Sequence, residues 1–351
     1  MRKLTHQRGT GSSIGPVALA VILVLVLSPS VVFAASSPWF PTTSLPIPLR
    51  SEGVFVTSSF VYSLGGDFLD RSGIGCPCGA TTQTFFAPRL SDGSLGSWIG
   101  TTQLPDFRAV FIPVVVNGRA YVIGGHRLDG FAEGSNTAFF APIQGDGSLG
   151  QWSTTTALPI SNFAYGVATH GSRIYIVGGS EGFGPRADVL FTKVMSDGTL
   201  GSWTFTTPLP VASEHLVVFV VGDRLYALAG TRTGTAVYVT PINPDGTLGA
   251  WSTTTPLPFA ANASAGVRVG HHLRLFITHQ TSPGKLVTTS VTTVVNPDGS
   301  LAPWAAGAKI PFPLYLFGMV GDSQTLYVVG GGIFFGPTRQ EVVYFKEFTR
   351  G

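Results

Sequence analysis

The chain has 351 residues, of which 44% are hydrophobic and only 11% are charged, whereas an average soluble domain has about 25% charged residues. Its 45 Gly and 25 Pro residues indicate a turn-rich chain and exclude a protein built from long helices. The formal charge of +3 comes from three basic residues among the first ten, and the rest of the chain is neutral. A nucleic-acid-binding protein is therefore not expected, because it would need a basic surface to meet phosphates.

Residues 1–34 have the features of an export signal peptide. A basic start precedes an apolar run from Val17 to Leu27, a Ser-Pro pair interrupts it, and Val and Ala occupy the positions that a signal peptidase reads. We expect cleavage after Ala34, which predicts a secreted or cell-surface protein without a membrane span. An uncleaved anchor is the alternative, because Pro16 to Ala35 could just cross a bilayer.

A unit of roughly 50 residues recurs along the rest of the chain. Five of the six Trp residues end the phrase Asp-Gly-Ser/Thr-Leu-Gly/Ala-x-Trp; a Leu-Pro or Ile-Pro pair follows, and then an aromatic-apolar-apolar-Gly-Gly phrase. The fifth unit departs from this phrase, and we align Leu275 to His279 with it. The Trp residues are Trp39, Trp98, Trp152, Trp203, Trp251 and Trp304. The aromatic phrases are Tyr62 to Gly66, Tyr121 to Gly125, Tyr175 to Gly179, Tyr327 to Gly331 and Tyr226 to Gly230, in which Ala229 replaces the first Gly.

Each unit predicts four short antiparallel strands, a to d. In the second unit, strand a is Val110 to Val116, strand b is Arg119 to Gly124, strand c is Thr137 to Ile143, and strand d begins at Trp152. An Asn-Gly pair between strands a and b predicts a two-residue hairpin turn. Four antiparallel strands in about 50 residues are typical of a β-propeller blade, and blades must stack to bury their faces.

The two ends of the chain predict how the ring of blades closes. The first unit begins at an outer strand d, Trp39 to Leu45, and the last unit ends at a strand c, Val342 to Phe348. Pairing of these two strands would leave no free sheet edge. The expected fold of residues 35–351 is therefore all-β: a six-bladed propeller with four antiparallel strands per blade, closed by the N-terminal outer strand joining the C-terminal blade.

The Tyr-apolar-apolar-Gly-Gly strand, the downstream Trp and the repeat length resemble Kelch repeats, including those of the central domain of galactose oxidase. The resemblance covers nearly all of residues 36–351 and implies a fold rather than an activity. The Asp-Gly phrase is more regular than a usual Kelch turn and resembles the Asp box of sialidase propellers, which has a structural role. We expect the same role here, with Asp capping the turn and with Leu and Trp packing between blades.

The two cysteines, Cys76 and Cys78, lie in one loop. A local disulfide is the expected state in an oxidising compartment, because two thiolates alone do not fill a zinc site. The copper site known on some Kelch-type propellers would need a Cys cross-linked to a Tyr and two His ligands, and this arrangement does not supply them. We therefore expect neither a metal nor a cofactor.

The candidate ligand site lies on the face that carries the b–c loops and the d–a segments. The other face carries the short a–b hairpins and the stereotyped c–d turns, whereas the b–c loops vary, and function tends to lie on variable loops of a rigid scaffold. Charged and aromatic side chains gather there, which suits a sugar, a peptide or an anionic small molecule. The candidate residues are Asp70, Arg71, Arg108, His126, Arg127, Asp129, Glu133, Glu181, Arg186, His215, Arg232 and Arg339.

Three functions remain open from the sequence. The leading hypothesis is a monomeric binding module for a glycan or an extracellular protein. A carbohydrate-active hydrolase or lyase is the alternative; it would use two carboxylates placed across the sugar, and no spacing among the loop carboxylates selects a pair. A structural cell-surface protein is the third, favoured by the low charge and the regular repeats.

Overall fold

The computed structural model describes residues 39–68, 79–127, 134–228, 230, 234–261, 263–282, 285–309, 318–331 and 343–347. The expected signal peptide and the two cysteines lie outside these ranges. Every regular element within them is a β-strand, and they contain no helix that could cross a lipid bilayer. The all-β prediction is confirmed.

The strands of the described residues form six four-stranded antiparallel sheets, named here in chain order, and a two-stranded ribbon. Sheet 1 contains β2 (Gly53–Val56), β3 (Phe60–Leu64), β6 (Thr84–Pro88) and β7 (Ile99–Gly100); the ribbon pairs β4 (Asp67–Phe68) with β5 (Gly79–Ala80). Sheet 2 contains β8 (Val114–Val116), β9 (Arg119–Ile123), β10 (Ala138–Pro142) and β11 (Ser153–Thr155). Sheet 3 contains β12 (Gly166–His170), β13 (Arg173–Val177), β14 (Val189–Lys193) and β15 (Thr204–Thr206).

The remaining sheets follow the same order of strands. Sheet 4 contains β16 (Val217–Val221), β17 (Arg224–Leu228), β18 (Val237–Pro241) and β19 (Ser252–Thr254). Sheet 5 contains β20 (Ala263–Val269), β21 (His272–Ser282), β22 (Lys285–Val294) and β23 (Ala305–Lys309). Sheet 6 contains β24 (Gly318–Gly321), β25 (Thr325–Val329), β26 (Val343–Glu347) and β1 (Phe40–Thr42).

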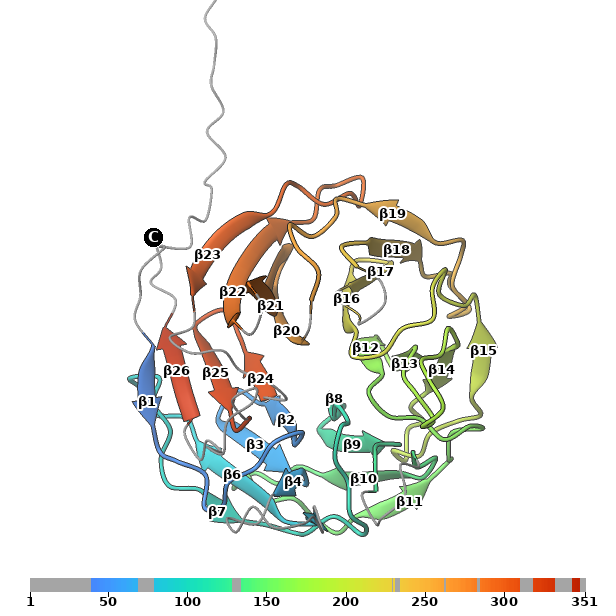
Figure 1. The fold of residues 1–351 in the computed structure, drawn as a ribbon. Helices are drawn as coiled ribbons and strands as arrows, with labels where there is room; N and C mark the ends of the chain where they lie inside the picture. The colour runs from blue at the N-terminus through green and yellow to red at the C-terminus, as the bar shows by residue number, and fades with distance from the viewer. Residues whose placement is uncertain are drawn as a thin grey trace, which may run out of the picture. The chain divides into compact units, whose positions relative to one another are not determined.

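The sheets follow one another around a ring, with the first strand of sheets 1 to 5 innermost and the last strand outermost (Figure 1). The inner strands of neighbouring sheets contact each other from β8 through β12, β16, β20 and β24 to β2. The ring of Phe111, just before β8, packs on Gly53 of β2 and completes the circuit. The apolar core therefore lies between the faces of neighbouring sheets, as in a propeller.

The first and last strands of the chain meet in sheet 6. Strand β1 pairs antiparallel with β26, with Phe40 opposite Phe345 and Thr42 opposite Val343. The expected closure by the N-terminal outer strand is confirmed at this pairing.

The predicted inner strand from Val110 to Val116 is wrong in its first half, since β8 begins at Val114. Val110 has a φ of 54°, in the left-handed region, and Ser51, Ala164 and His215 hold the same conformation at the corresponding places of their repeats. The amide of Val110 donates to Ser51 O (2.8 Å), that of Ala164 to Val110 O (3.0 Å) and that of His215 to Ala164 O (2.6 Å). These bonds link sheets 1 to 4 and hold a conformation that costs free energy for a residue other than Gly.

The Asp-Gly phrase forms the turn between the third and fourth strands. In sheet 2, Asp146 Oδ1 accepts hydrogen bonds from Ser148 N (2.9 Å) and Ser148 Oγ (2.7 Å). Gly147 has a φ of 92°, which favours glycine. Asp92, Asp197, Asp245 and Asp298 make the same two bonds in their turns.

A repeated set of hydrogen bonds, called the clamp below, ties each such turn to the preceding sheet. Leu149 N donates to Thr101 Oγ1 (2.8 Å), and Thr102 Oγ1 donates to Leu149 O (2.6 Å). Trp152 Nε1 donates to Thr102 O (3.1 Å). The equivalent Thr pairs are Thr42 and Thr43, Thr155 and Thr156, Thr206 and Thr207, and Thr254 and Thr255.

The repeated tyrosine completes the clamp from the second strand of the preceding sheet. Tyr62 Oη donates to Gly147 O (2.8 Å), so a buried hydroxyl meets the turn of the next sheet. The same bond joins Tyr121 to Gly198, Tyr175 to Gly246, Tyr226 to Gly299 and Tyr327 to Gly93.

Sheet 5 lacks both halves of the clamp. Arg274 pairs with Val267 as Tyr226 pairs with Phe219. Arg274 therefore stands at the tyrosine position, and the predicted alignment of Leu275 there is wrong by one residue. Gly307 and Ala308 stand where the Thr pair occurs after the other Trp residues. The reason is topological: the next turn would have to join β26 to β1, which are not consecutive in the chain.

The interface between sheets 5 and 6 is held by an aromatic contact instead. The ring of Trp39 meets Phe276 edge-on, with centroids 5.8 Å apart and an interplanar angle of 74°. Within the described ranges, Trp39 Nε1 has no hydrogen-bond partner, whereas the other five Trp side chains donate to the preceding sheet.

Candidate functional site

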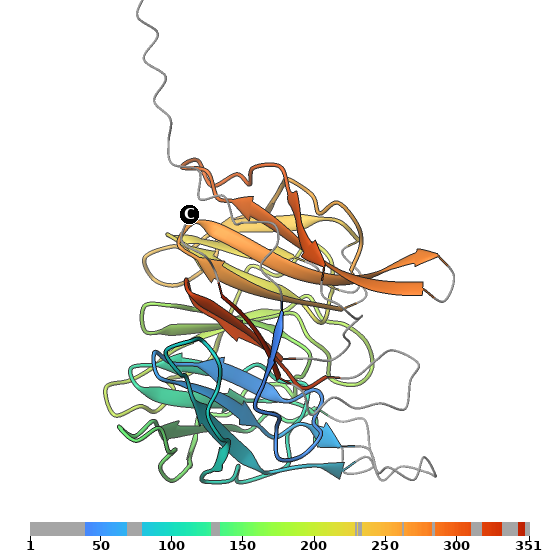
Figure 2. The ribbon, with the colours of Figure 1, turned by 90° about the vertical axis from the view of Figure 1, so that its left-hand side faces the viewer.

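The b–c loops and the d–a segments meet on one face, called the loop face below. Isolated bridges join Arg50 to Asp67, Ala109 to His126 and Phe163 to Ser180, each pairing a d–a residue with the start of a b–c loop. Sheet 5 extends on this face, because β21 and β22 continue as a hairpin beyond the neighbouring strands (Figure 2).

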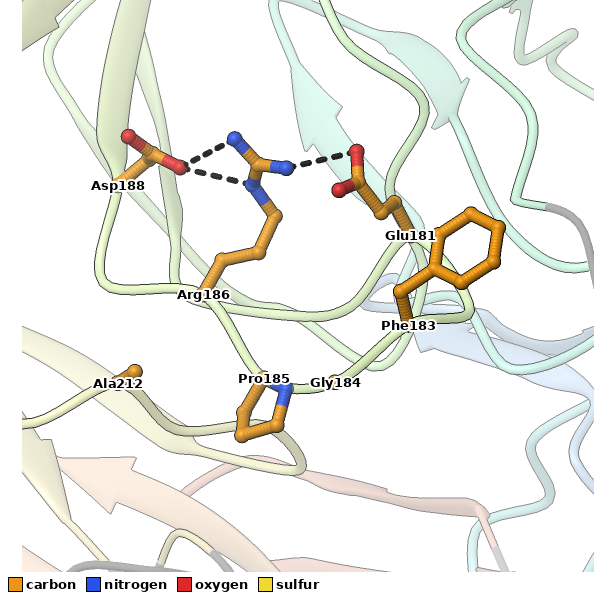
Figure 3. A pocket seen from close by; sticks show the side chains of 7 residues that line it. All are labelled: Glu181, Phe183, Gly184, Pro185, Arg186, Asp188 and Ala212. Carbon is orange, nitrogen blue, oxygen red and sulfur yellow. Dashed lines mark hydrogen bonds and ion pairs between the residues drawn. The ribbon is translucent and has the colours of Figure 1, made fainter.

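A pocket on the loop face lies between the b–c loop of sheet 3 and the d–a segment that leads to sheet 4 (Figure 3). Its volume is about 510 Å³, which is enough for a small ligand or one end of a larger one. It is lined by Glu181, Phe183, Gly184, Pro185, Arg186, Asp188 and Ala212.

Arg186 is the cation of this pocket and is flanked by two carboxylates (Figure 3). Its Nε and Nη2 each lie 2.7 Å from Asp188 Oδ2, and its Nη1 lies 2.7 Å from Glu181 Oε2. These bonds fix the planes of all three groups. The trio carries one more negative than positive charge.

Phe183 forms the apolar part of the pocket. Its side chain is 93% exposed, although phenylalanine is usually buried. Gly182 (φ 112°) and Gly184 (φ 131°) flank it in backbone conformations that favour glycine. Ser180 Oγ donates to Gly184 O (3.1 Å) and accepts from Gly182 N (3.2 Å), so the loop that presents the ring is held by its own hydrogen bonds.

The structure brings together only part of the set of candidate residues. Glu181 and Arg186 meet in the pocket, and Asp188 joins them although the sequence analysis did not select it. His215 lies three residues beyond the lining residue Ala212, in the left-handed conformation described above. Burial lowers the pKa of His215, and the charge of Glu214 opposes that shift.

Arg108 and Arg127 belong to a separate cluster around Asp106, next to sheet 2, whereas the ring of His126 meets Phe163 edge-on, with centroids 4.9 Å apart. Asp106 Oδ2 lies 3.1 Å from Arg108 Nη1 and 3.5 Å from Arg127 Nε. Arg108 is 0% exposed and also donates to Phe107 O (2.7 Å), so it supports the fold and is out of reach of a ligand in this conformation. Its burial lowers its pKa.

The other six candidate residues lie outside the described residues: they are Asp70, Arg71, Asp129, Glu133, Arg232 and Arg339. The two cysteines, Cys76 and Cys78, also lie outside them. Within the described ranges, no group of three or more His, Cys, Asp or Glu side chains is arranged to hold a metal ion.

Glu52 is an ionisable residue that the sequence analysis missed. It follows the left-handed Ser51, at the repeat position that Phe111, Tyr165 and Leu216 fill elsewhere. Burial, aided by the charge of Asp67, raises its pKa to about 8, and the amides of Glu52 and Gly318 only partly offset this. The repeat alignment could have revealed it, as a carboxyl at an otherwise apolar position.

The carboxyl of Glu52 lies at the interface between sheets 1 and 6. A Cβ on Gly330 would lie 2.2 Å from Glu52 Oε1, so the glycine makes room for it. Neither carboxyl oxygen makes a hydrogen bond of good geometry within the described residues. Nearby, Arg50 Nε donates to Asp67 Oδ2 (2.8 Å), so the two neighbouring acids have different environments.

Comparison with known proteins agrees with this fold. No protein-family model matches the chain. Kelch-like protein 41 is 26% identical to it in Rattus norvegicus and Mus musculus and 25% identical in Homo sapiens, over 133 residues. The match covers 38% of this chain and 20% of each relative, so the chain matches about a fifth of the length of these relatives.

The solved structure of YjhT resembles the whole ring. It matches with a TM-score of 0.63 and 12% identity, over 86% of this chain and 95% of that chain. At this identity the likeness shows the fold alone. The sheets and this likeness define a β-propeller. With the Tyr-x-x-Gly-Gly strands and the Kelch-like relatives, the chain is a Kelch-type β-propeller.

Proposed function

We propose that this protein is an exported binding module that holds a glycan in the pocket between sheets 3 and 4. Each four-stranded sheet is then one blade, so the exported part, residues 35–351, is a six-bladed propeller. The export step rests on the signal features of residues 1–34.

The observation that carries the proposal is the exposed ring of Phe183 beside the fixed Glu181–Arg186–Asp188 trio. A pyranose presents an apolar face of C–H groups and an edge of hydroxyls. The phenyl ring suits the first, because aromatic rings offer a large apolar surface. Carboxylates held in place by an arginine suit the second, because each still has an oxygen lone pair to accept a hydroxyl hydrogen.

A hydrolase acting in the same pocket is the second candidate. Glu181 and Asp188 are two carboxylates on one pocket, and glycoside hydrolysis requires such a pair. Both, however, contact the same guanidinium. The arrangement therefore favours binding over turnover, and product release distinguishes the two.

The experiment is a polysaccharide array probed with the protein purified from the medium of expressing cells, assayed for retention and for released sugar. We expect retention without release, and a loss of roughly tenfold or more in affinity for Phe183→Ala, the size typical of an aromatic anchor. Phe205→Ala is the matched control, because Phe205 is also exposed (51%) but lies on the outer strand β15. Released sugar would favour the hydrolase, and equal loss in both variants would contradict the assigned pocket.

A further inference from the structure

We infer that the glycan held by this pocket carries no acidic group, so that neutral and amino sugars bind and uronic acids do not. This inference rests on the proposed function and narrows it to a ligand class. It follows from the state of the arginines on the loop face, which the sequence alone would suggest as anion receptors.

Arg186 is the residue that an acidic sugar would need. A carboxylate ligand is normally recognised by a guanidinium with two free parallel N–H donors. In the pocket, Nε and Nη2 are both directed at Asp188 Oδ2, and Nη1 is directed at Glu181 Oε2. The edge that would receive a ligand carboxylate is therefore already occupied by Asp188.

The charges around the pocket also disfavour an acidic ligand. An anionic ligand would face two carboxylates across one cation, and like charges at such distances repel. Glu214 lies two residues from the lining residue Ala212 and adds another negative charge nearby. His215 does not compensate, because its lowered pKa leaves it neutral at pH 7.

The other arginines that the structure describes on this face also contact carboxylates. Arg50 pairs with Asp67, and Arg108 and Arg127 share Asp106. Asp106 is 28% exposed beside the 47%-exposed Arg127, so this carboxylate also faces water and opposes the positive charge there. Asp67 is buried, with 5% of its side chain exposed, and neutralises Arg50 from beneath. The described part of the face thus offers sugar hydroxyls paired acceptors and donors rather than an excess of positive charge.

The test uses matched glycans that differ in one group: an immobilised neutral polysaccharide, its uronic-acid counterpart and an amino-sugar polymer. We expect retention on the neutral or the amino-sugar polymer and at least tenfold weaker retention on the uronate at low salt. Stronger retention on the uronate than on the neutral polymer would overturn the inference while leaving a glycan-binding function intact. No retention on any of the three would contradict both.

A gain-of-function variant tests the same point from the opposite direction. Asp188→Ala frees one edge of Arg186, so uronate retention should rise by roughly fivefold, about the effect of one partly exposed ion pair. Asp223→Ala is the control: it removes the same charge from an a–b hairpin residue, which is 83% exposed and contacts His170. An equal rise in both variants would mean that net charge, and not the Arg186 edge, sets the preference. Thermal unfolding of both variants confirms that they fold.

Discussion

The five clamped interfaces and the one unclamped interface between neighbouring sheets show what the repeated residues are for. Wherever the next sheet has an Asp-Gly turn, a Tyr and a Thr pair of the preceding sheet form hydrogen bonds with that turn. Between sheets 5 and 6, where chain connectivity removes that turn, Arg274, Gly307 and Ala308 replace them. The Tyr and Thr residues therefore serve the bonds between sheets, since sheet 5 forms its four strands without them.

The largest expected effect comes from removing Trp39 to Pro46. This deletion removes β1, so it leaves β26 as an open edge of sheet 6. It also removes the Thr42–Thr43 clamp between sheets 6 and 1 and the Trp39–Phe276 contact between sheets 5 and 6. We expect a fall in Tm of more than about 10 °C, because several kcal/mol are lost. Scanning calorimetry measures it, and an unchanged transition would refute closure through β1.

The clamped interface between sheets 6 and 1 also contains Glu52, which should make stability depend on pH. Its pKa rises from the ordinary value of 4.5 to about 8 in the folded protein. Folding therefore favours the protonated form of Glu52. Its contribution to the free energy of unfolding is fully present below pH 4.5 and is lost as the pH rises toward 8. The expected slope is about 1.4 kcal/mol per pH unit within that window.

Glu52→Gln should remove this slope and make the protein more stable than the parent at pH 8. Urea unfolding at pH 5, 6.5 and 8 measures it. The control is Asp223→Asn, an exposed carboxylate on the a–b hairpin face, which should leave the slope unchanged. A parent protein that gains stability between pH 5 and 8 would show that Glu52 is not the buried acid described here.

Single clamp bonds should have smaller effects. Tyr175→Phe removes the hydroxyl that donates to Gly246 O (2.9 Å) and leaves that carbonyl without its partner, which costs about 1 kcal/mol. The control is Tyr238→Phe: Tyr238 is also buried, but it lies on the third strand of sheet 4 and takes no part in the clamp. Equal changes in the free energy of unfolding for the two variants would contradict the clamp.

Much of the fold could be predicted from sequence because its determinants are local and repeated. The Tyr-x-x-Gly-Gly strand and the Asp-Gly turn fix strand b and the turn between strands c and d in the repeats that carry them, and the positions of Trp39 and the last strand imply closure. The short inner strand β8 could not be predicted. The left-handed conformation of Val110 depends on a carbonyl of the neighbouring sheet, Ser51 O.

The candidate site was less predictable for a related reason. Glu181 and Arg186 are candidates because they are scarce charges on a variable loop, but the pattern does not show that Asp188, just before β14, contacts the guanidinium. Nor could the burial of Arg108 be foreseen, since it depends on packing against Phe139 of a neighbouring strand, with Arg108 Cζ 5.5 Å from the ring centroid.

The assignment of the pocket is tested most directly by amide hydrogen exchange with and without a retained glycan. The account predicts protection of residues 180–188 and 210–213, which surround Phe183 and Arg186, and little change in the β21–β22 hairpin. Protection confined to that hairpin, or to the Asp-Gly turns on the opposite face, would contradict the pocket as the binding site.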